Sequence, residues 1–104
     1  MRDNIEIQTT DFWVKVVGML QQNWALAEDT GSTTVYFITD TSGIFDTLTF
    51  ETMKEAEGAL KRNGFRHFAQ CPDLQSFLQP PSAPFHKTDH PNGPIYSSGQ
   101  FWLP

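Results

Sequence analysis

The chain has 104 residues, of which 38% are hydrophobic and 18% are charged. This length and balance are typical of one folded domain with a modest core, and they exclude a disordered chain. The formal net charge of -5 argues against a general nucleic-acid binder, which needs Lys and Arg to displace counterions, and against a surface that adheres to anionic lipid.

The cellular compartment is predicted from the N-terminus and from cysteine usage. Residues 1–6 carry acids and have no apolar stretch, so we expect no signal peptide. No apolar run in the sequence approaches the length of a membrane span, so we expect no membrane partner. Cys71 is the only cysteine, which excludes an intramolecular disulfide and fits a reducing compartment. We therefore expect a cytoplasmic protein.

Residues 12–22 are predicted to form a helix, with Thr10 or Asp11 as its N-cap. Its apolar positions would cover more than half of the helix circumference. These positions are Phe12, Trp13, Val16, Val17, Met19 and Leu20. A helix this apolar is either deeply buried or shared with a second subunit. The segment therefore supports a homodimer, as does the surplus of aromatic residues in a small domain.

Residues 24–28, 33–40 and 44–50 are predicted to be strands, and the short links between them imply antiparallel neighbours in a meander. In the third strand, Asp46 falls on the apolar face that includes Ile44. A buried carboxylate is costly unless it is hydrogen-bonded or protonated, which makes Asp46 a site candidate. The alternative is a bulge near the preceding turn that rotates Asp46 to solvent.

Residues 52–63 carry the clearest helix signals. Thr52 and Glu55 form a capping box, in which each side chain satisfies a free backbone donor of the first turn. Gly64 suits the left-handed position that follows the last turn of a helix. Residues 65–69 are predicted to be a fourth strand that returns to the sheet.

Residues 72–78 are predicted to form a short helix, after which the composition changes. All seven prolines lie at or after position 72, and they argue against regular structure beyond residue 80. We therefore divide the chain into an α+β core domain, residues 1–79, and a proline-rich arm with an aromatic tail, residues 80–104. The tail is expected to dock on the same domain or on a partner subunit. The expected fold is a three- to four-stranded antiparallel meander packed against two main helices.

Residues 29–32, Asp-Thr-Gly-Ser, spell the active-site signature of an aspartic protease. That chemistry requires two aspartates that share one proton, and a dimer could supply them. However, Ala27 and Glu28 depart from the apolar pair that precedes this motif in retroviral-type proteases, and we identify no glycine-rich flap. Hairpin turns use the same four residue types. We therefore interpret the motif as a turn.

Two other sets of side chains have the chemistry of a site but not its usual spacing. His86, Asp89 and His90 could hold Zn²⁺, yet their spacing matches no strong metal signature. Cys71 with His67 would suit a thiol nucleophile, but a lone cysteine beside a proline is more often a small buried hydrophobe. We therefore predict no metal site, no cofactor and no catalytic residue.

Aromatic side chains supply the candidate ligand pocket. Its predicted members are Trp13, Trp24, Tyr36, Phe45 and Asp46. The alternative is that these rings form a core or an interface between subunits. Lys61, Arg62 and Arg66 form a basic cluster and a candidate anion contact. The acidic net charge favours the alternative, in which they complement the dipole at the end of a helix.

Residues 90–102, HPNGPIYSSGQFW, resemble a segment of small uncharacterised proteins that are carried on bacterial integron gene cassettes. Residues 35–50 contribute to the same resemblance. The resemblance implies a bacterial, cytoplasmic protein from a mobile gene pool, often a homodimer. It implies no catalytic residues.

For function, we expect a non-enzymatic binding or protein-interaction module that acts as a homodimer, with a small molecule or a protein as its partner. The alternative is a small enzyme or a small-molecule sensor with an aromatic-lined pocket. A nucleic-acid partner that uses the basic cluster is disfavoured by the acidic net charge.

Overall fold

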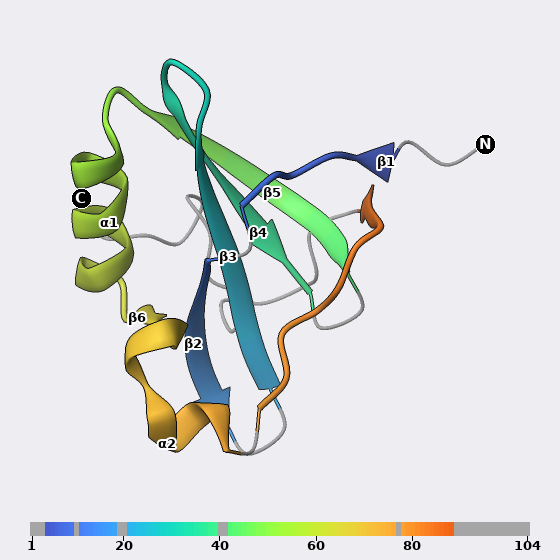
Figure 1. Cartoon of the computed structure of the whole chain (residues 1–104), viewed down its shortest axis with the longest axis vertical. Coiled ribbons are helices and arrows are strands. Elements are labelled where there is room, and N and C mark those ends of the chain that lie inside the picture. Colours follow the sequence, from blue (N-terminus) through green and yellow to red (C-terminus); the bar gives the residue numbers. More distant parts are fainter. Residues whose placement is uncertain (1–3, 10, 19–20, 40–41, 77, 89–104) are drawn as a thin grey trace.

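The computed structural model describes residues 4–9, 11–18, 21–39, 42–76 and 78–88, and Figure 1 shows their arrangement. The predicted aromatic tail lies outside the described residues. The elements in chain order are β1 (Asn4–Ile5), β2 (Phe12–Gly18), β3 (Gln21–Asp29), β4 (Thr33–Ile38), β5 (Gly43–Phe50), α1 (Met53–Arg62), β6 (Arg66–His67), the 3-10 helix η1 (Phe68–Gln70), α2 (Pro72–Gln75) and β7 (Phe85–Lys87). The fold class is α+β, as predicted.

Within the described residues, the strands form one mixed sheet in the order β1-β7-β5-β4-β3-β2-β6. β2, β3, β4 and β5 are consecutive antiparallel neighbours. β5 pairs in parallel with β7, through Gly43 with His86 and Ile44 with Lys87. β1 and β6 are two residues long and pair with β7 and β2 respectively. Short strands therefore occupy both edges of the sheet.

The predicted helix at residues 12–22 is wrong, because this segment forms β2 and the start of β3. Phe12 and Val14 lie in the core on one face of the sheet, and Trp13 lies in the core on the other. A strand that is covered on both faces is apolar at odd and even positions alike. The same pattern is expected of a buried helix, so the pattern alone does not distinguish the two. The valines of this segment favour the strand.

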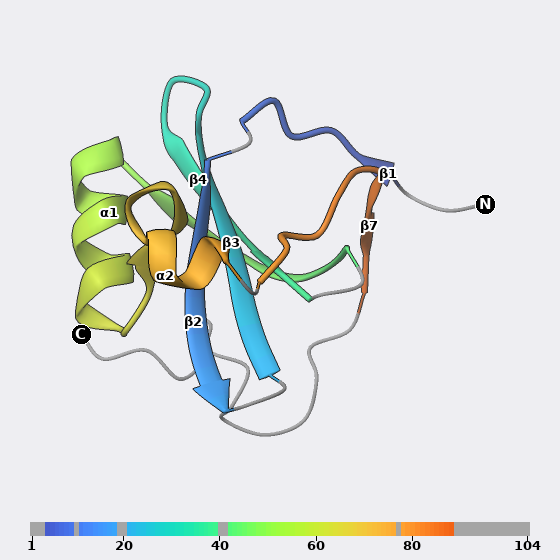
Figure 2. The same ribbon diagram turned by 60° about the horizontal axis from the view of Figure 1, so that its bottom comes forward.

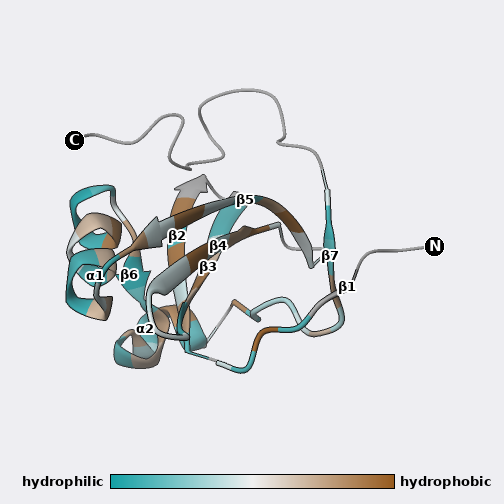
Figure 3. Cartoon of the chain, turned by 90° about the horizontal axis from the view of Figure 1, so that it is seen from above, coloured by the Kyte–Doolittle hydropathy of each residue, from teal (hydrophilic) through white to brown (hydrophobic). Residues whose placement is uncertain are grey.

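Two hydrophobic cores lie on opposite faces of the sheet. The α2-side core contains Phe12, Val14, Trp24, Leu26, Ile38, Ile44, Cys71, Leu74 and Phe85. The α1-side core contains Trp13, Ala25, Ala27, Val35, Phe37, Phe45, Ala56, Leu60 and Phe65. α1 contacts β3, β4 and β5, and Figure 2 shows it beside the sheet. Figure 3 shows the hydrophobic residues along these central strands.

The predicted helix at residues 52–63 is confirmed by α1. The Thr52 hydroxyl accepts a hydrogen bond from the backbone N–H of Glu55 at 3.2 Å, which is half of the predicted capping box. Gly64 follows the last turn with φ of 90°, a left-handed conformation that glycine adopts without strain. Lys15 of β2 packs over Gly64, 3.2 Å from where a β-carbon would lie. Local signals therefore position α1 against the sheet.

A bulge in β5 determines which side chains face each core. Phe37 pairs with Asp46 and Ile38 pairs with Ile44, so Phe45 is the extra residue of β5. The predicted common face of Ile44 and Asp46 is therefore wrong, and the alternative of a bulge near the preceding turn describes β5 better. Ile44 belongs to the α2-side core, whereas Leu48 and Phe50 pack on the α1-side core. The bulge also brings Phe45 to the α1 side, beside Asp46.

Candidate functional site

A groove of about 360 Å³ opens where β5 and β7 stop pairing. It is lined by Ile44, Phe45, Asp46, Thr47, Lys87 and Thr88, and we call it the β5–β7 groove. Next to the pairing of Ile44 with Lys87, the Thr88 N–H donates a hydrogen bond to the carbonyl oxygen of Ile44, at 2.9 Å. β5 continues to Phe50, whereas its pairing with β7 ends at Ile44. The groove therefore lies beside the part of β5 that follows its pairing with β7.

Gly43 allows β7 to approach β5 at the base of the groove. A β-carbon on Gly43 would lie 2.8 Å from Cγ2 of Thr88 and 3.1 Å from the hydroxyl oxygen of Thr39. The Gly43 N–H donates a hydrogen bond to that hydroxyl at 3.0 Å. Because the side chains of Thr88 and Thr39 fill the space beside Gly43, a larger residue there would displace Thr88, which lines the groove.

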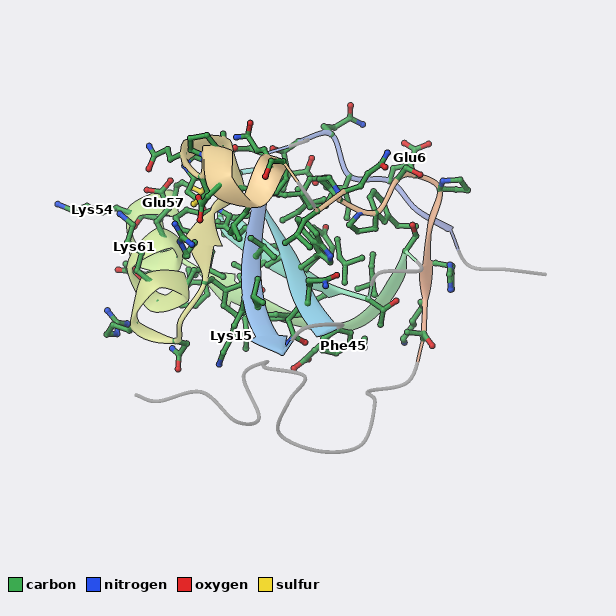
Figure 4. The ribbon with its side chains drawn as sticks, turned by 90° about the horizontal axis from the view of Figure 1, so that it is seen from below. Glu6, Lys15, Phe45, Lys54, Glu57 and Lys61 are labelled. Carbon is green, nitrogen blue, oxygen red and sulfur yellow. The ribbon has the colours of Figure 1, made fainter. Side chains whose placement is uncertain are left out.

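The β5–β7 groove carries opposite charges beside an aromatic ring. Asp46 is half-buried, and its Oδ1 accepts a hydrogen bond from the Thr47 N–H at 2.8 Å. Lys87 is exposed, and in the described part of the chain neither Asp46 nor Lys87 forms an ion pair. Phe45 is 7% exposed, and Figure 4 shows it on the same side of the sheet as Lys15. The groove can therefore offer a carboxylate and an ammonium group beside the small exposed part of Phe45.

The sheet separates the five residues of the predicted ligand pocket. Trp13 lies in the α1-side core, where its ring stacks on His67 at 4.8 Å between centroids. Trp24 lies in the α2-side core, and Tyr36 packs against the same core. Phe45 and Asp46 are the two predicted members that line one groove together.

The three residues of the predicted anion contact lie on two elements, α1 and β6. Lys61 and Arg62 are exposed in the last turn of α1, where they complement the helix dipole. Arg66 is exposed on β6, and its Nη1 lies 3.5 Å from a carboxylate oxygen of Asp73. A second groove, of about 530 Å³ between α1 and the end of β5, includes Arg62 but neither Lys61 nor Arg66.

The protease-like motif is a hairpin turn between β3 and β4. Asp29 is exposed, and its Oδ1 accepts a hydrogen bond from the Gly31 N–H at 3.1 Å. The Thr30 N–H donates to the carbonyl oxygen of Ser32 at 2.9 Å. Gly31 has φ of 108°, a conformation that the turn requires and glycine tolerates.

Of the residues considered for a thiol nucleophile or a metal site, the structure describes Cys71, His67 and His86. Cys71 is buried in the α2-side core, whereas His67 stacks on Trp13 of the opposite core. The Nε2 atom of His67 lies 2.6 Å from Oδ1 of Asp11. Asp89 and His90 lie outside the described residues. The described residues contain no group of three or more His, Cys, Asp or Glu side chains that could hold a metal ion.

Glu28 is a buried acid that the sequence analysis did not single out as a site residue. It is 8% exposed, and its Oε1 accepts a hydrogen bond from the Gln8 N–H at 2.6 Å. Burial raises the pKa of Tyr36 above its ordinary value of 10.0, and the negative charge of Glu28 raises that pKa further. Side chains alternate between the two faces of β3, which puts Glu28 on the same face as Trp24 and Leu26. This alternation could have identified Glu28 from the sequence.

The raised pKa of Tyr36 makes the folded state less stable in alkali. Above about pH 10 the unfolded chain loses the phenol proton while the folded chain keeps it, so stability falls as the pH rises. Tyr36→Phe should remove this part of the fall. Thermal unfolding between about pH 8 and pH 11 checks it. Equal losses of melting temperature in the wild type and in Tyr36→Phe would show that Tyr36 titrates alike in both states.

Comparison with protein-family models, with curated proteins and with solved structures finds no match. Among the described residues, no helix has the length and hydropathy that a membrane crossing requires. The candidate site therefore rests on its own geometry, and the β5–β7 groove is the place where that geometry gathers complementary chemistry.

Proposed function

We propose that the protein is a non-enzymatic binding module that acts as a homodimer, and that the β5–β7 groove is its ligand site. The observation that carries the proposal is the placement of Asp46 and Lys87 in one groove with the ring of Phe45. In the described part of the chain these two charges form no ion pair with each other or with another side chain. They are therefore available to a ligand.

The ligand class follows from these groups. A molecule with one ammonium group and one carboxylate group complements Asp46 and Lys87, and its apolar part can lie against Phe45. The hydroxyl groups of Thr47 and Thr88 can donate and accept hydrogen bonds at the rim. Free amino acids with an apolar side chain have this combination of groups. Among the described residues that line the groove, none carries an imidazole or a thiol, the side chains that most often act as general base or nucleophile, and we take this in favour of binding.

The homodimer is supported by the outer edge of β2. β6 pairs with Trp13 and Val14 only, and no described strand pairs with the rest of this edge. Val16, in that remaining part, is 45% exposed, the large hydrophobic side chain that stands out on the described surface. An open strand edge with an exposed valine can pair with the same edge of a second copy across a twofold axis. The segment that was expected to be an apolar helix forms β2 and the start of β3, so it lends the dimer no support.

Calorimetric titration with L-phenylalanine tests the ligand site. Phenethylamine lacks the carboxylate group and 3-phenylpropionate lacks the ammonium group, so each should bind at least about tenfold more weakly than L-phenylalanine. Equal affinities for the three compounds, or no binding of L-phenylalanine, would contradict the proposed ligand class.

Sedimentation equilibrium of the same samples tests the dimer. We expect a dimer for the wild type and a monomer for Val16→Lys, because a lysine at the strand edge disfavours pairing. Lys61→Gln, a change of similar size at an exposed position of α1, should leave the dimer intact. A monomeric wild type across micromolar concentrations would rule out the dimer and leave the ligand site to be judged on calorimetry.

A further inference from the structure

A second cavity, of about 280 Å³, lies on the α2 side of the sheet. It is lined by Ile7, Thr9, Phe12, Pro81, Ser82, Ala83 and Phe85, and none of these residues lines the β5–β7 groove. We call it the strap cavity because two segments, residues 4–9 and 81–85, form its walls. Figures 1 and 2 show these two segments converging where β1 meets β7.

Hydrogen bonds hold both segments in place. Residues 4–9 are fixed at one end by the pairing of β1 with β7 and near the other end by the bond from the Gln8 N–H to Glu28. Residues 81–85 are fixed by a bond from the Ser42 hydroxyl to the carbonyl oxygen of Ser82, at 2.6 Å. The His86 N–H also donates to the carbonyl oxygen of Ser42, at 3.1 Å. The cavity is thus a built feature with anchored walls.

The lining of the strap cavity is mainly apolar. Phe12 and Phe85 are buried members of the α2-side core, and Ile7 packs against that core. None of the lining residues carries an ionisable side chain, so a charged ligand would lose its hydration without gaining a partner. The volume of the strap cavity exceeds that of apolar cavities, about 150 Å³, that are known to bind single-ring hydrocarbons. A ligand regains the dispersion contacts that the walls of an empty cavity lack.

We propose that the strap cavity binds a small, uncharged, apolar molecule of about the size of one aromatic ring. Such a ligand would pack against the rings of Phe12 and Phe85 and between the two anchored segments. This site is independent of the β5–β7 groove, because the two sites share no residue and differ in ligand charge.

Toluene is the probe, with benzoate as its charged counterpart, and binding is followed by chemical-shift changes in the wild-type protein. Toluene should bind with a Kd of about 1 mM or lower, and benzoate should bind at least about tenfold more weakly. Ile7→Trp places a larger side chain in the cavity and should weaken toluene binding at least about tenfold. Thr9→Leu fills the cavity from another position. It replaces Ile7→Trp in the test if that variant does not fold.

Leu48→Phe is the matched control, because it enlarges a half-buried side chain at the α1-side core, outside the strap cavity. Its affinity for toluene should stay within about twofold of the wild type. No toluene binding by the wild type, equal affinity for benzoate, or unchanged toluene binding in a folded cavity-filling variant would each overturn the proposal. L-phenylalanine binding should survive in Ile7→Trp, which separates a failure of this site from a failure of the groove.

Discussion

Phe37→Ala should lower the free energy of unfolding by about 3–5 kcal/mol. Phe37 is 0% exposed on β4, in the middle of the sheet. Its ring lies 6.3 Å from that of Phe45 and 6.1 Å from that of Phe65, between centroids. The truncation would leave a cavity beneath α1 that rigid neighbouring strands cannot close. Since domains of this size are stable by about 5–15 kcal/mol in total, the variant would lose a large share of its stability.

Urea denaturation followed by fluorescence measures this loss. Thr49→Ala on the adjacent strand β5 is the control, because Thr49 is exposed and its truncation should cost no more than about 1 kcal/mol. A loss below about 1 kcal/mol for Phe37→Ala would mean that the α1-side core does not pack around this ring.

Trp24→Ala should cost a similar amount, about 3–5 kcal/mol, on the opposite face of the sheet. Trp24 is 1% exposed, and its ring makes edge contacts with Phe12 at 5.7 Å and with Phe68 at 5.3 Å. Its indole N–H has no hydrogen-bond acceptor among the described residues. Trp24→Phe therefore loses area but no hydrogen bond, and it should cost only about 1–2 kcal/mol. Urea denaturation of both variants measures the difference.

Trp24 also distinguishes the structure from the pocket predicted by the sequence analysis. The predicted pocket grouped Trp24 with Phe45, whereas the structure puts them in cores on opposite faces. Trp24→Phe should therefore keep the affinity for L-phenylalanine within about twofold of the wild type. A folded Trp24→Phe variant that loses this affinity would indicate that Trp24 contributes to the ligand site after all.

The elements that could be predicted from the sequence are those with local signals. The helix α1 has a capping threonine at Thr52, acidic residues early, basic residues late and Gly64 at its end. These features act within a few residues of each other, so they are legible without knowledge of the fold. The hairpin turn at Asp29 and Gly31 is local in the same sense.

The segment 12–22 could not be assigned correctly, because its pattern reflects the surroundings rather than the local chain. An apolar run of this length is compatible with a buried helix and with a strand covered on both faces. Gly18 is followed by Met19 and Leu20, so the sequence has no asparagine-glycine or similar pair to mark a hairpin there. The deciding factor is that α1 and α2 cover opposite faces of the sheet, which is a property of the whole fold.

The site was only half predictable for a related reason. Asp46 was identified because its acid broke an apolar alternation, and Phe45 because aromatic residues are pocket formers. Lys87 joins them through the parallel pairing of β5 with β7, two strands far apart in the sequence. No local pattern encodes such a pairing, and Lys87 lay in a stretch for which prolines argued against regular structure. Glu28, in contrast, could have been found from the alternation of its strand.

The most direct test of the β5–β7 groove is a calorimetric cycle that combines two variants with the three probes. Asp46→Asn should bind L-phenylalanine and 3-phenylpropionate with similar affinity, since the ammonium group has then lost its partner, and should still discriminate against phenethylamine. Lys87→Gln should bind L-phenylalanine and phenethylamine with similar affinity, since the carboxylate group has then lost its partner, and should still discriminate against 3-phenylpropionate. Glu51→Gln and Lys61→Gln, at exposed positions outside the groove, should keep the wild-type preference. If Asp46→Asn and Lys87→Gln instead keep the full wild-type discrimination between the probes, these two side chains do not hold the ligand.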